Sequence, residues 1–296
     1  MTVRYFVPDM PNAGGEWELP EGEAHHAATV MRTRVGDRVV LFDGRGHQAQ
    51  AVVTAVSKRV VRCESEGADY VPRDNAIGMW MGVALPKGER AKELVERLTE
   101  LGVDRLTPLG CERSPWDVSE GTFAKLTRVV IEACKQSGRN RLMRIDPPAR
   151  CSDWLKGGAV SGVGGEAAVG EGERMGSLGV GSAWLAHPGG SAWLAHPGGS
   201  AWLAHPGGGR IGDLALSAKG GLGSELSLAS AREGERSWVR MAIGPEGGFT
   251  DAEVAVGESA GWIKVGLGER IYRIETAAVL LASLVSAIGF VGKGMK

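Results

Sequence analysis

Apolar residues recur with different spacings in two parts of the chain, and the spacing changes near residue 76. Before it, short valine-rich runs are separated by turn residues such as Gly44, which is typical of β-strands. The runs cover residues 4–7, 38–42, 48–56 and 59–64. We therefore predict a small β-barrel over residues 1–72, with one short helix at 23–31. The polar, proline-containing run 70–75 suits a linker.

From residue 76 onward, apolar runs of strand length alternate with amphipathic helical patterns. Apolar residues between Ala91 and Leu101 recur at helical spacing on one face, and Gly102 stands where a helix-ending glycine is expected. The strand candidates are 77–85, 105–109 and 142–145, and the second helix candidate is 123–136. This alternation predicts a mainly parallel sheet with helices on both faces. We assign residues 76–296 to this α/β domain.

A glycine- and serine-rich stretch, residues 157–235, interrupts this order. Within it the unit Ser-Ala-Trp-Leu-Ala-His-Pro-Gly-Gly begins at Ser182, Ser191 and Ser200. One unit holds a short strand and a turn, which is too little to stack into a core of its own. We interpret the unit as a triplicated native strand, of which one copy occupies the sheet while the others form a loop. The regular spacing of its histidines gives no convergent metal site, and no metal is expected.

Composition narrows the classes of protein that the chain can belong to. Hydrophobic residues make up 43% of the 296 residues and the net charge is −1, so any binding of nucleic acid must rely on local basic patches. The 4 cysteines form no Cys-x-x-Cys pair and predict reduced thiols in the cytosol. The N-terminus lacks the apolar segment of a signal peptide, and the apolar helix expected at 276–290 is short for a membrane span. We therefore expect a soluble, cytoplasmic protein.

The most informative stretch is the glycine-proline turn at 244–248, which follows the apolar run 238–243. A predicted helix then begins near Thr250. Glycines let a ligand approach the main chain closely, and a helix start offers free N–H groups. The alternative interpretation is a plain strand–turn–helix connection. The turn lacks both the Gly-Lys-Ser/Thr ending and the Gly-x-Gly-x-x-Gly spacing, which are the usual signatures of nucleotide triphosphate and dinucleotide sites.

A second block, residues 267–277, places charged side chains just before an almost entirely apolar helix. Arg270, Arg273 and Glu275 are the charged residues that matter here. A carboxylate is favoured at the start of a helix, so capping with surface charge is one interpretation. Paired arginines beside a glycine turn can also bind a phosphate bidentately, which makes the block a candidate anion site.

Basic residues also gather at the end of the helix predicted at 123–136. Lys135, Arg139 and Arg141 suit the negative end of the helix dipole, and they would equally suit an RNA backbone. Cys134, in the same segment, has no neighbouring histidine base. We therefore expect it to be a packing residue and not a nucleophile.

Taken together, these blocks resemble the RsmE family of SPOUT-class methyltransferases, which methylate N3 of a uridine in 16S ribosomal RNA. The match runs in order along nearly the whole chain. Its most specific parts are the turn at 243–249, the block at 267–277 and the Gln-Ser-Gly-Arg segment that ends at Arg139. The other matching segments are 42–44, 88–90, 100–103, 112–114, 132–135 and 203–206. The stretch 157–235 is longer here than in the family because of the triplication.

The resemblance implies a PUA-like β-barrel followed by a SPOUT α/β domain with a deep trefoil knot. It also implies S-adenosyl-L-methionine as the methyl donor, no metal, and a homodimer. The helix at 276–290 suits a dimer interface, although a buried core helix would show the same pattern. By resemblance, the two blocks and the third repeat copy line the cofactor site. The residues are Leu203, His205, Ile243, Gly244, Pro245, Glu246, Gly247, Leu267, Gly268, Arg270 and Ile271.

The implied reaction assigns further roles. Uridine N3 carries a proton at neutral pH, so methylation needs a base or stabilisation of the uracil anion. Glu275 and Glu246 are candidate bases, and Arg273 is a candidate to stabilise negative charge on the uracil oxygens. The implied partner is the 16S RNA of the small ribosomal subunit. The candidate RNA-binding residues are His26, Arg32, Arg113, Arg139 and Arg141.

Two alternatives remain open at this point. A SPOUT enzyme could methylate a ribose 2′-hydroxyl or another RNA base. A non-catalytic RNA-binding protein could carry a cofactor pocket that the inserted repeat has disrupted. The order of matching segments along the whole chain favours the uridine N3 reaction.

Overall fold

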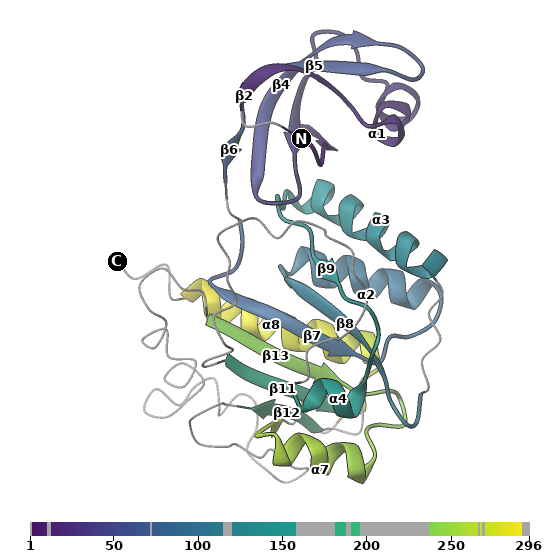
Figure 1. The fold of residues 1–296 in the computed structure, drawn as a ribbon, viewed down its shortest axis with the longest axis vertical. Helices are drawn as coiled ribbons and strands as arrows, with labels where there is room; N and C mark the ends of the chain where they lie inside the picture. Colours follow the sequence, from purple (N-terminus) through teal and green to yellow (C-terminus); the bar gives the residue numbers. More distant parts are fainter. Residues whose placement is uncertain are drawn as a thin grey trace. The chain divides into compact units, whose positions relative to one another are not determined.

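The structure is a computed structural model in which two compact units are formed (Figure 1). The first unit comprises Met1–Asp74 and Arg128–Leu142, and the second comprises Asn75–Thr127 and Met143–Lys296. The residues that the structure describes are 2–10, 13–71, 73–114, 120–157, 181–187, 191–195, 237–265, 267 and 270–291.

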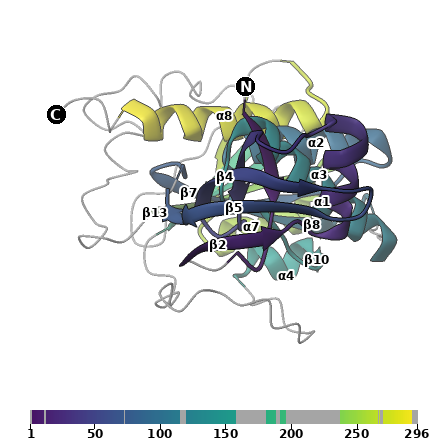
Figure 2. The same ribbon diagram turned by 90° about the horizontal axis from the view of Figure 1, so that it is seen from above.

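The first unit is built on a six-stranded sheet in the order β1-β3-β4-β5-β2, with β6 paired to β4. The strands are β1 (Val3–Phe6), β2 (Ala13–Glu18), β3 (Arg38–Phe42), β4 (His47–Val56), β5 (Val61–Gly67) and β6 (Asp69–Tyr70). β1 is parallel to β3 and the other pairs are antiparallel, so that β4, β5 and β2 run side by side (Figure 2). The four predicted strands are confirmed. β2 and β6 were missed because polar residues and glycine dominate them.

The core of this unit follows from the alternation along its strands. In β4, Ala49, Ala51 and Val53 are buried, whereas Gln50 and Val52 between them are exposed. The predicted helix is present in two parts, α1 (Glu21–His26) and the π-helical η1 (Ala27–Met31). The buried side chains of the strands and of this helical segment together form one hydrophobic core.

The second unit contains an eight-stranded sheet in the order β10-β8-β7-β13-β11-β12-β14, with β9 paired to β8. The strands are β7 (Ile77–Val83), β8 (Arg105–Gly110), β9 (Arg144–Ile145), β10 (Ala149–Arg150), β11 (Gly181–His187), β12 (Ser191–Ala195), β13 (Ser237–Ile243) and β14 (Ile263–Val265). Pairing is parallel except at β12, which is antiparallel to β11 and β14. The prediction of a mainly parallel sheet is confirmed.

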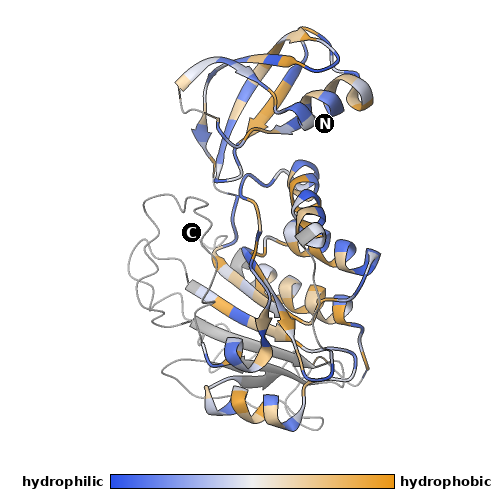
Figure 3. Ribbon diagram, turned by 45° about the vertical axis from the view of Figure 1, so that its right-hand side comes forward, coloured by the Kyte–Doolittle hydropathy of each residue, from blue (hydrophilic) through white to orange (hydrophobic). Residues whose placement is uncertain are grey.

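Helices cover both faces of this sheet, as predicted. α2 (Glu89–Glu100) and α8 (Ile274–Val291) pack together on one face, and α4 (Cys151–Leu155) and α7 (Asp251–Ser259) lie on the other (Figure 1). Strand β7 between these layers is buried along its whole length and largely hydrophobic (Figure 3). Gly102 has a φ of 80° just after α2, as a helix-ending glycine should. Among the helices of the described residues, none combines the length and hydrophobicity that a membrane span requires.

Helix α3 (Glu120–Ser137) runs from the residues of the second unit into those of the first. Beyond its end, the N–H of Leu142 donates to the carbonyl of Gly44 at 2.9 Å, and the amide of Asn140 donates to Gln48 at 3.0 Å. These contacts group the segment with the barrel, although the sequence boundaries placed it in the α/β domain.

The repeat region differs from the expectation that one copy occupies the sheet. β11 is the first copy and pairs parallel with β13, while β12 is the second copy and pairs antiparallel with β11. That expectation was wrong, because two copies with the same alternation can also pair with each other. The third copy lies outside the described residues.

Candidate functional site

Three segments that are far apart in the sequence meet at the carboxyl edge of the parallel sheet. β7 and β13 pair over their full length, from Ile77↔Ser237 to Val83↔Ile243, so the residues that follow them lie at one edge. After β7 the chain enters α2, and after β13 it enters the turn at 244–250. In open α/β sheets, ligands bind at this edge.

Arg90, in the first turn of α2, joins the three segments. Its Nε and Nη2 donate to the two carboxylate oxygens of Glu275 at 3.1 and 2.9 Å, and Nη2 also donates to Glu246 at 3.0 Å. Glu246 lies in the turn and Glu275 in the first turn of α8. A guanidinium fork matches a carboxylate in this two-bond geometry. The side chains of Arg90 and Glu246 are 39% and 60% exposed, so the bridge lies at the surface of the unit.

This bridge determines the charge of Glu275. Burial alone would raise its pKa, but the hydrogen bonds from Arg90 outweigh burial, and the pKa of Glu275 is lowered. The charge of Arg273 acts in the same direction. A carboxylate with a lowered pKa is a weak proton acceptor at neutral pH. The geometry therefore favours Glu275 as an anchor for Arg90 over its role as a general base.

The turn after β13 is shaped by its own main chain. The N–H of Gly248 donates to the carbonyl of Pro245 at 2.8 Å, and Gly248 has a φ of 72°, which other residues rarely adopt. Gly244 is needed for a different reason, because a Cβ there would lie 3.0 Å from the buried ring of Phe249. Glycine therefore lets the turn close against that ring.

The helix that follows begins with a capping box. The Thr250 hydroxyl accepts a hydrogen bond from the N–H of Glu253 at 3.2 Å, and the N–H of Thr250 donates to the Glu253 carboxylate at 2.8 Å. The predicted helix start is confirmed. This reciprocal pair holds the end of the turn in a defined place relative to α7.

Two residues that follow β8 also contact the turn. The N–H of Glu112 donates to Glu253 at 3.0 Å, and the guanidinium of Arg113 donates to the carbonyls of Gly247 and Phe249. Arg113 was a candidate for binding RNA. Its hydrogen bonds instead support a role in holding the main chain of the turn.

The residues predicted to line the cofactor site differ in exposure. Ile243, Gly244, Pro245 and Leu267 are buried, whereas Glu246, Gly247, Arg270 and Ile271 are exposed. Ile271 is 82% exposed, which is unusual for an aliphatic side chain and leaves it free to contact a ligand or partner. Leu203, His205 and Gly268 lie outside the described residues, and their roles stay predictions.

The two catalytic candidates occupy neighbouring positions at the start of α8. Arg273 is exposed, and its carbonyl accepts a hydrogen bond from Ala277 at 2.9 Å. Glu275 is held by Arg90, as described above. The role of Arg90 was missed, although the residue stood in the matching segment 88–90. Its position in the first turn after a predicted strand was the available signal, and its partners could not be read from the sequence.

The basic candidates in the first unit are unequally available to RNA. Arg32 is exposed and has a φ of 54°, and His26 is half-buried. Arg139 is buried, with an exposure of 5%. The guanidinium of Arg141 contacts Asp74 at 2.9 Å and donates to the Tyr70 hydroxyl at 2.9 Å. Arg32 and His26 are thus the candidates that remain open to a partner.

A buried carboxylate organises a turn in the same unit. Asp43 Oδ1 accepts hydrogen bonds from the N–H groups of Arg45 and His47 at 2.7 and 3.0 Å, and the His47 ring Nδ1 lies 2.8 Å from Oδ2. Burial alone would raise the pKa of Asp43, but these hydrogen bonds outweigh it and lower the pKa. Asp43 therefore stays ionised and holds the turn between β3 and β4.

Two family models match this architecture. A model described as an RNA methyltransferase domain matches residues 73–162 and 212–286, more than half of the chain. A model described as an RNA methyltransferase PUA domain matches residues 19–64 in the barrel.

Curated relatives extend over nearly the whole chain. The ribosomal RNA small subunit methyltransferase E of Mycobacterium bovis is 28% identical over 293 residues, covering 97% of this chain and 92% of the relative. The enzyme of the same name from Bacillus subtilis is 25% identical, covering 89% of this chain and 87% of its own.

Solved structures share the fold. The ribosomal RNA small subunit methyltransferase E of Neisseria gonorrhoeae, bound to S-adenosyl methionine, aligns with a TM-score of 0.69 at 22% identity, covering 97% of this chain and 98% of its own. A methyltransferase from Legionella pneumophila, in complex with bound SAM, aligns with a TM-score of 0.67 at 23% identity over the same shares. With its barrel, its parallel sheet and these matches, the chain belongs to the RsmE family of RNA methyltransferases.

Proposed function

We propose that this protein transfers the methyl group of S-adenosyl-L-methionine to N3 of a uridine in the 16S RNA of the small ribosomal subunit. The observation that carries the proposal is the meeting of the turn at 244–250 with the start of α8 at the carboxyl edge of the sheet, joined by Arg90. The curated relatives named for methylation of small-subunit ribosomal RNA support this substrate.

The residues at this edge fit the chemistry of the cofactor. Gly247 is exposed and has no side chain, which leaves the main chain of the turn accessible to a ligand at this position. The exposed side chain of Ile271 offers an apolar contact, which an adenosyl group needs. When bound, the cofactor supplies an electrophilic methyl carbon. The proposal includes the deep trefoil knot of the family, in which loops from separate parts of the chain would surround the cofactor.

The reaction has a simple balance. The N3–methyl bond forms as the sulfur–methyl bond breaks, the sulfonium becomes a neutral thioether, and the N3 proton leaves. The task of this chain is to align N3 with the methyl carbon and to favour loss of the proton. Exposed Arg273 would stabilise negative charge on the uracil oxygens, while Glu275 would position Arg90 and, through it, Glu246.

RNA would be held by the first unit, which matches a PUA domain. Arg32 and His26 are the candidates that remain accessible there. Contacts to phosphates make affinity fall as salt concentration rises. The target base must leave its stack to present N3, as for other enzymes that modify bases.

The outer face of α8 supports a homodimer as part of the proposal. Thr276 and Ala287 are exposed, and the aliphatic residues Val279, Leu280 and Leu284 between them are half-buried. Their spacing of three and four places them on one side of the helix. We expect Leu284→Arg to yield monomers in light scattering. A dimer that survives this change would place the interface elsewhere.

The deciding experiment analyses nucleosides of ribosomal RNA. Purified protein, S-adenosyl-L-methionine and small subunits from a strain lacking the enzyme should yield 3-methyluridine, detected by mass spectrometry after digestion. A 2′-O-methyl nucleoside would instead assign ribose chemistry. Calorimetry with S-adenosyl-L-methionine distinguishes a methyltransferase of either kind from a non-catalytic RNA-binding protein. The RNA-binding protein should give no heat of binding. Parallel assays on naked RNA identify the physiological form of the substrate in the cytoplasm.

A further inference from the structure

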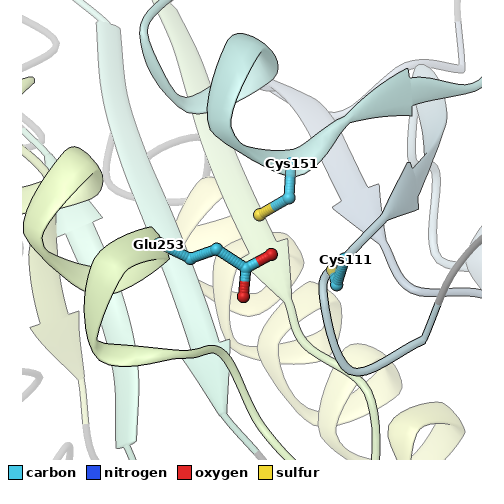
Figure 4. Close-up of side chains that lie close together, drawn as sticks. All are labelled: Cys111, Cys151 and Glu253. Atoms are coloured by element: carbon cyan, nitrogen blue, oxygen red, sulfur yellow. The ribbon is translucent and has the colours of Figure 1, made fainter.

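Cys111, Cys151 and Glu253 form a cluster that the proposed reaction does not use (Figure 4). Cys111 directly follows β8 and Cys151 opens α4 directly after β10. These two strands pair in register, Ala149 with Leu109 and Arg150 with Gly110, so one further step places the cysteines side by side. Glu253 reaches them from the first turn of α7. The spacing of these residues in the sequence contains no metal-binding motif, and only the fold brings them together.

The donor atoms of the cluster lie close together in buried residues. One sulfur from each cysteine and one oxygen of Glu253 all lie within 4.8 Å of one another. The exposures are 2% for Cys111, 1% for Cys151 and 3% for Glu253. In Figure 4 the Cys151 sulfur and the Glu253 carboxylate face each other, with Cys111 at the neighbouring strand end. Zinc bonds to sulfur at about 2.3 Å and to oxygen at about 2.0–2.2 Å, so small shifts would bring all three donors to one ion.

The carboxylate is already held in place. Oε1 accepts the N–H of Glu112 at 3.0 Å, and Oε2 accepts the N–H and the hydroxyl of Thr250 at 2.8 and 3.3 Å. Each carboxylate oxygen has two lone pairs, so Oε1 keeps capacity for a further partner. Such fixed ligands, supported by outer hydrogen bonds, are typical of metal sites.

Without a cation, the surroundings of Cys151 favour its protonated thiol. The hydrogen bond with Cys111, burial and the Glu253 carboxylate all raise the pKa of Cys151. The surroundings are apolar and include Trp154, Leu155 and Phe249. Thiolates in such a place require a counter-charge, and a thiophilic cation supplies it.

We propose that Cys111, Cys151 and Glu253 bind a thiophilic divalent cation of the zinc class. On binding, both thiol protons pass to solvent and two metal–sulfur bonds and one metal–oxygen bond form; with three protein ligands, the fourth position of a tetrahedral zinc falls to water. The ion ties the end of β8, the start of α4 and the start of α7. Glu253 also caps the helix that follows the turn at 244–250. By holding Glu253, the ion also restrains the position of that turn.

The test uses the full chain under reducing conditions with cobalt or zinc alone. Cobalt bound by thiolates develops a near-ultraviolet charge-transfer absorption, and zinc should abolish it by competition. We expect one ion per chain, and a higher melting temperature with zinc. Cys111→Ser and Cys151→Ser should each weaken binding by more than about tenfold, since even an outer partner of a metal ligand contributes that much.

Two further variants keep the result interpretable. Glu253→Gln removes the charge and keeps one acceptor oxygen for the N–H of Thr250, as in a capping box with glutamine, while its NH2 group replaces the oxygen that accepts from Glu112. It should still fold, with a lower melting temperature than the wild type, and bind cobalt more weakly. Cys63→Ser, in the core of the other unit, should bind cobalt as the wild type does. Absence of the thiolate absorption in wild-type protein, or its persistence in both cysteine variants, overturns the proposal.

Discussion

Each unit of the protein contains a charged network around a glycine-containing turn, and the two networks are built in opposite ways. In the barrel, Asp43 is buried and its partners, Arg45 and His47, lie two and four residues away. In the α/β unit, the partners of Arg90 lie 156 and 185 residues away, and Arg90 itself is 39% exposed.

This difference separates stability from function. A buried, local network leaves donors unsatisfied when it is broken, so its loss destabilises the fold. An exposed pair contributes little to stability, because water and ions compete for both charges. A long-range network at a ligand-binding edge instead determines how separate loops are placed. We therefore expect the Asp43 network to govern folding and the Arg90 network to govern methyl transfer.

The largest expected effect is on stability at Asp43. Asp43→Ala leaves the N–H groups of Arg45 and His47 without their acceptor, and we expect unfolding free energy to fall by about 3 kcal/mol. Urea denaturation followed by circular dichroism measures this. Glu16→Ala is the control, since the described contacts of Glu16 are exposed: a pair with Arg62 at 3.9 Å and a hydrogen bond from the Thr54 hydroxyl at 3.4 Å. Equal stability of the two variants would contradict the comparison.

The next effect is on activity at Arg90. Arg90→Ala removes the link between the turn and the start of α8. We expect kcat/KM to fall by about 100-fold, the effect of misplacing reacting groups by about 1 Å. Stability should change by less than the Asp43 variant shows, because the Arg90 side chain is 39% exposed and water screens its charge. Lys92→Ala, which removes an exposed pair in the same helix, should keep full activity. A variant that loses stability but keeps its rate would reverse the roles assigned to the two networks.

A smaller effect is expected where Arg113 holds the turn. Arg113→Ala removes the donor to the carbonyls of Gly247 and Phe249. Charge-assisted hydrogen bonds of this kind justify an expected loss of about tenfold in affinity for S-adenosyl-L-methionine. Calorimetry measures it, with Arg97→Ala as the exposed control in α2. An unchanged affinity would mean that the turn keeps its shape unaided.

The pH dependence of stability tests the Asp43 network in the wild-type protein. The folded pKa of Asp43 is lowered, so the stabilisation is present above the unfolded pKa, about 3.9, and is lost as pH falls through the folded pKa. Unfolding free energy of the wild type should therefore fall more steeply below pH 4 than that of Asp43→Asn. Denaturation curves between neutral pH and pH 3 compare them. Parallel curves would mean that Asp43 is not a main source of acid sensitivity.

The smallest effect is expected at Glu246. Its side chain is 60% exposed, and its removal leaves the two-bond pair of Arg90 with Glu275 in place. Glu246→Gln should lower kcat/KM by only about threefold, a surface-pair contribution. Glu275→Gln should cost more, because it breaks the bidentate pair. If Glu246→Gln were the more damaging change, Glu246 would have a direct part in the reaction.

Much of the architecture was readable from residue patterns. The valine-rich runs became strands, and the glycine turn at 244–248 leads into a capped helix. Strand β2 was missed because Gly14 and Gly15 and the glutamates beside them carry no apolar alternation. Its pairing with β5 comes from the neighbouring strand and not from its own composition.

The site was only partly predictable, for a related reason. Glu246 and Glu275 stood out as charged residues in glycine-rich blocks, but their common partner Arg90 did not. Arg113 was interpreted as a contact for RNA because a free arginine and one that binds a carbonyl look the same in a sequence. A side chain's partner depends on which strands become neighbours, and that is a property of the whole sheet.

The sequence by itself determined the approximate positions of the apolar strands, the amphipathic helices and the glycine turns, because these depend on residues within a few positions of one another. The tertiary structure decided which distant groups meet: Arg90 with its two carboxylates, and Cys111 with Cys151 and Glu253. It also decided that the first two repeat copies pair in the sheet. Identical copies have identical local preferences, so only the order and register of the strands could distinguish them.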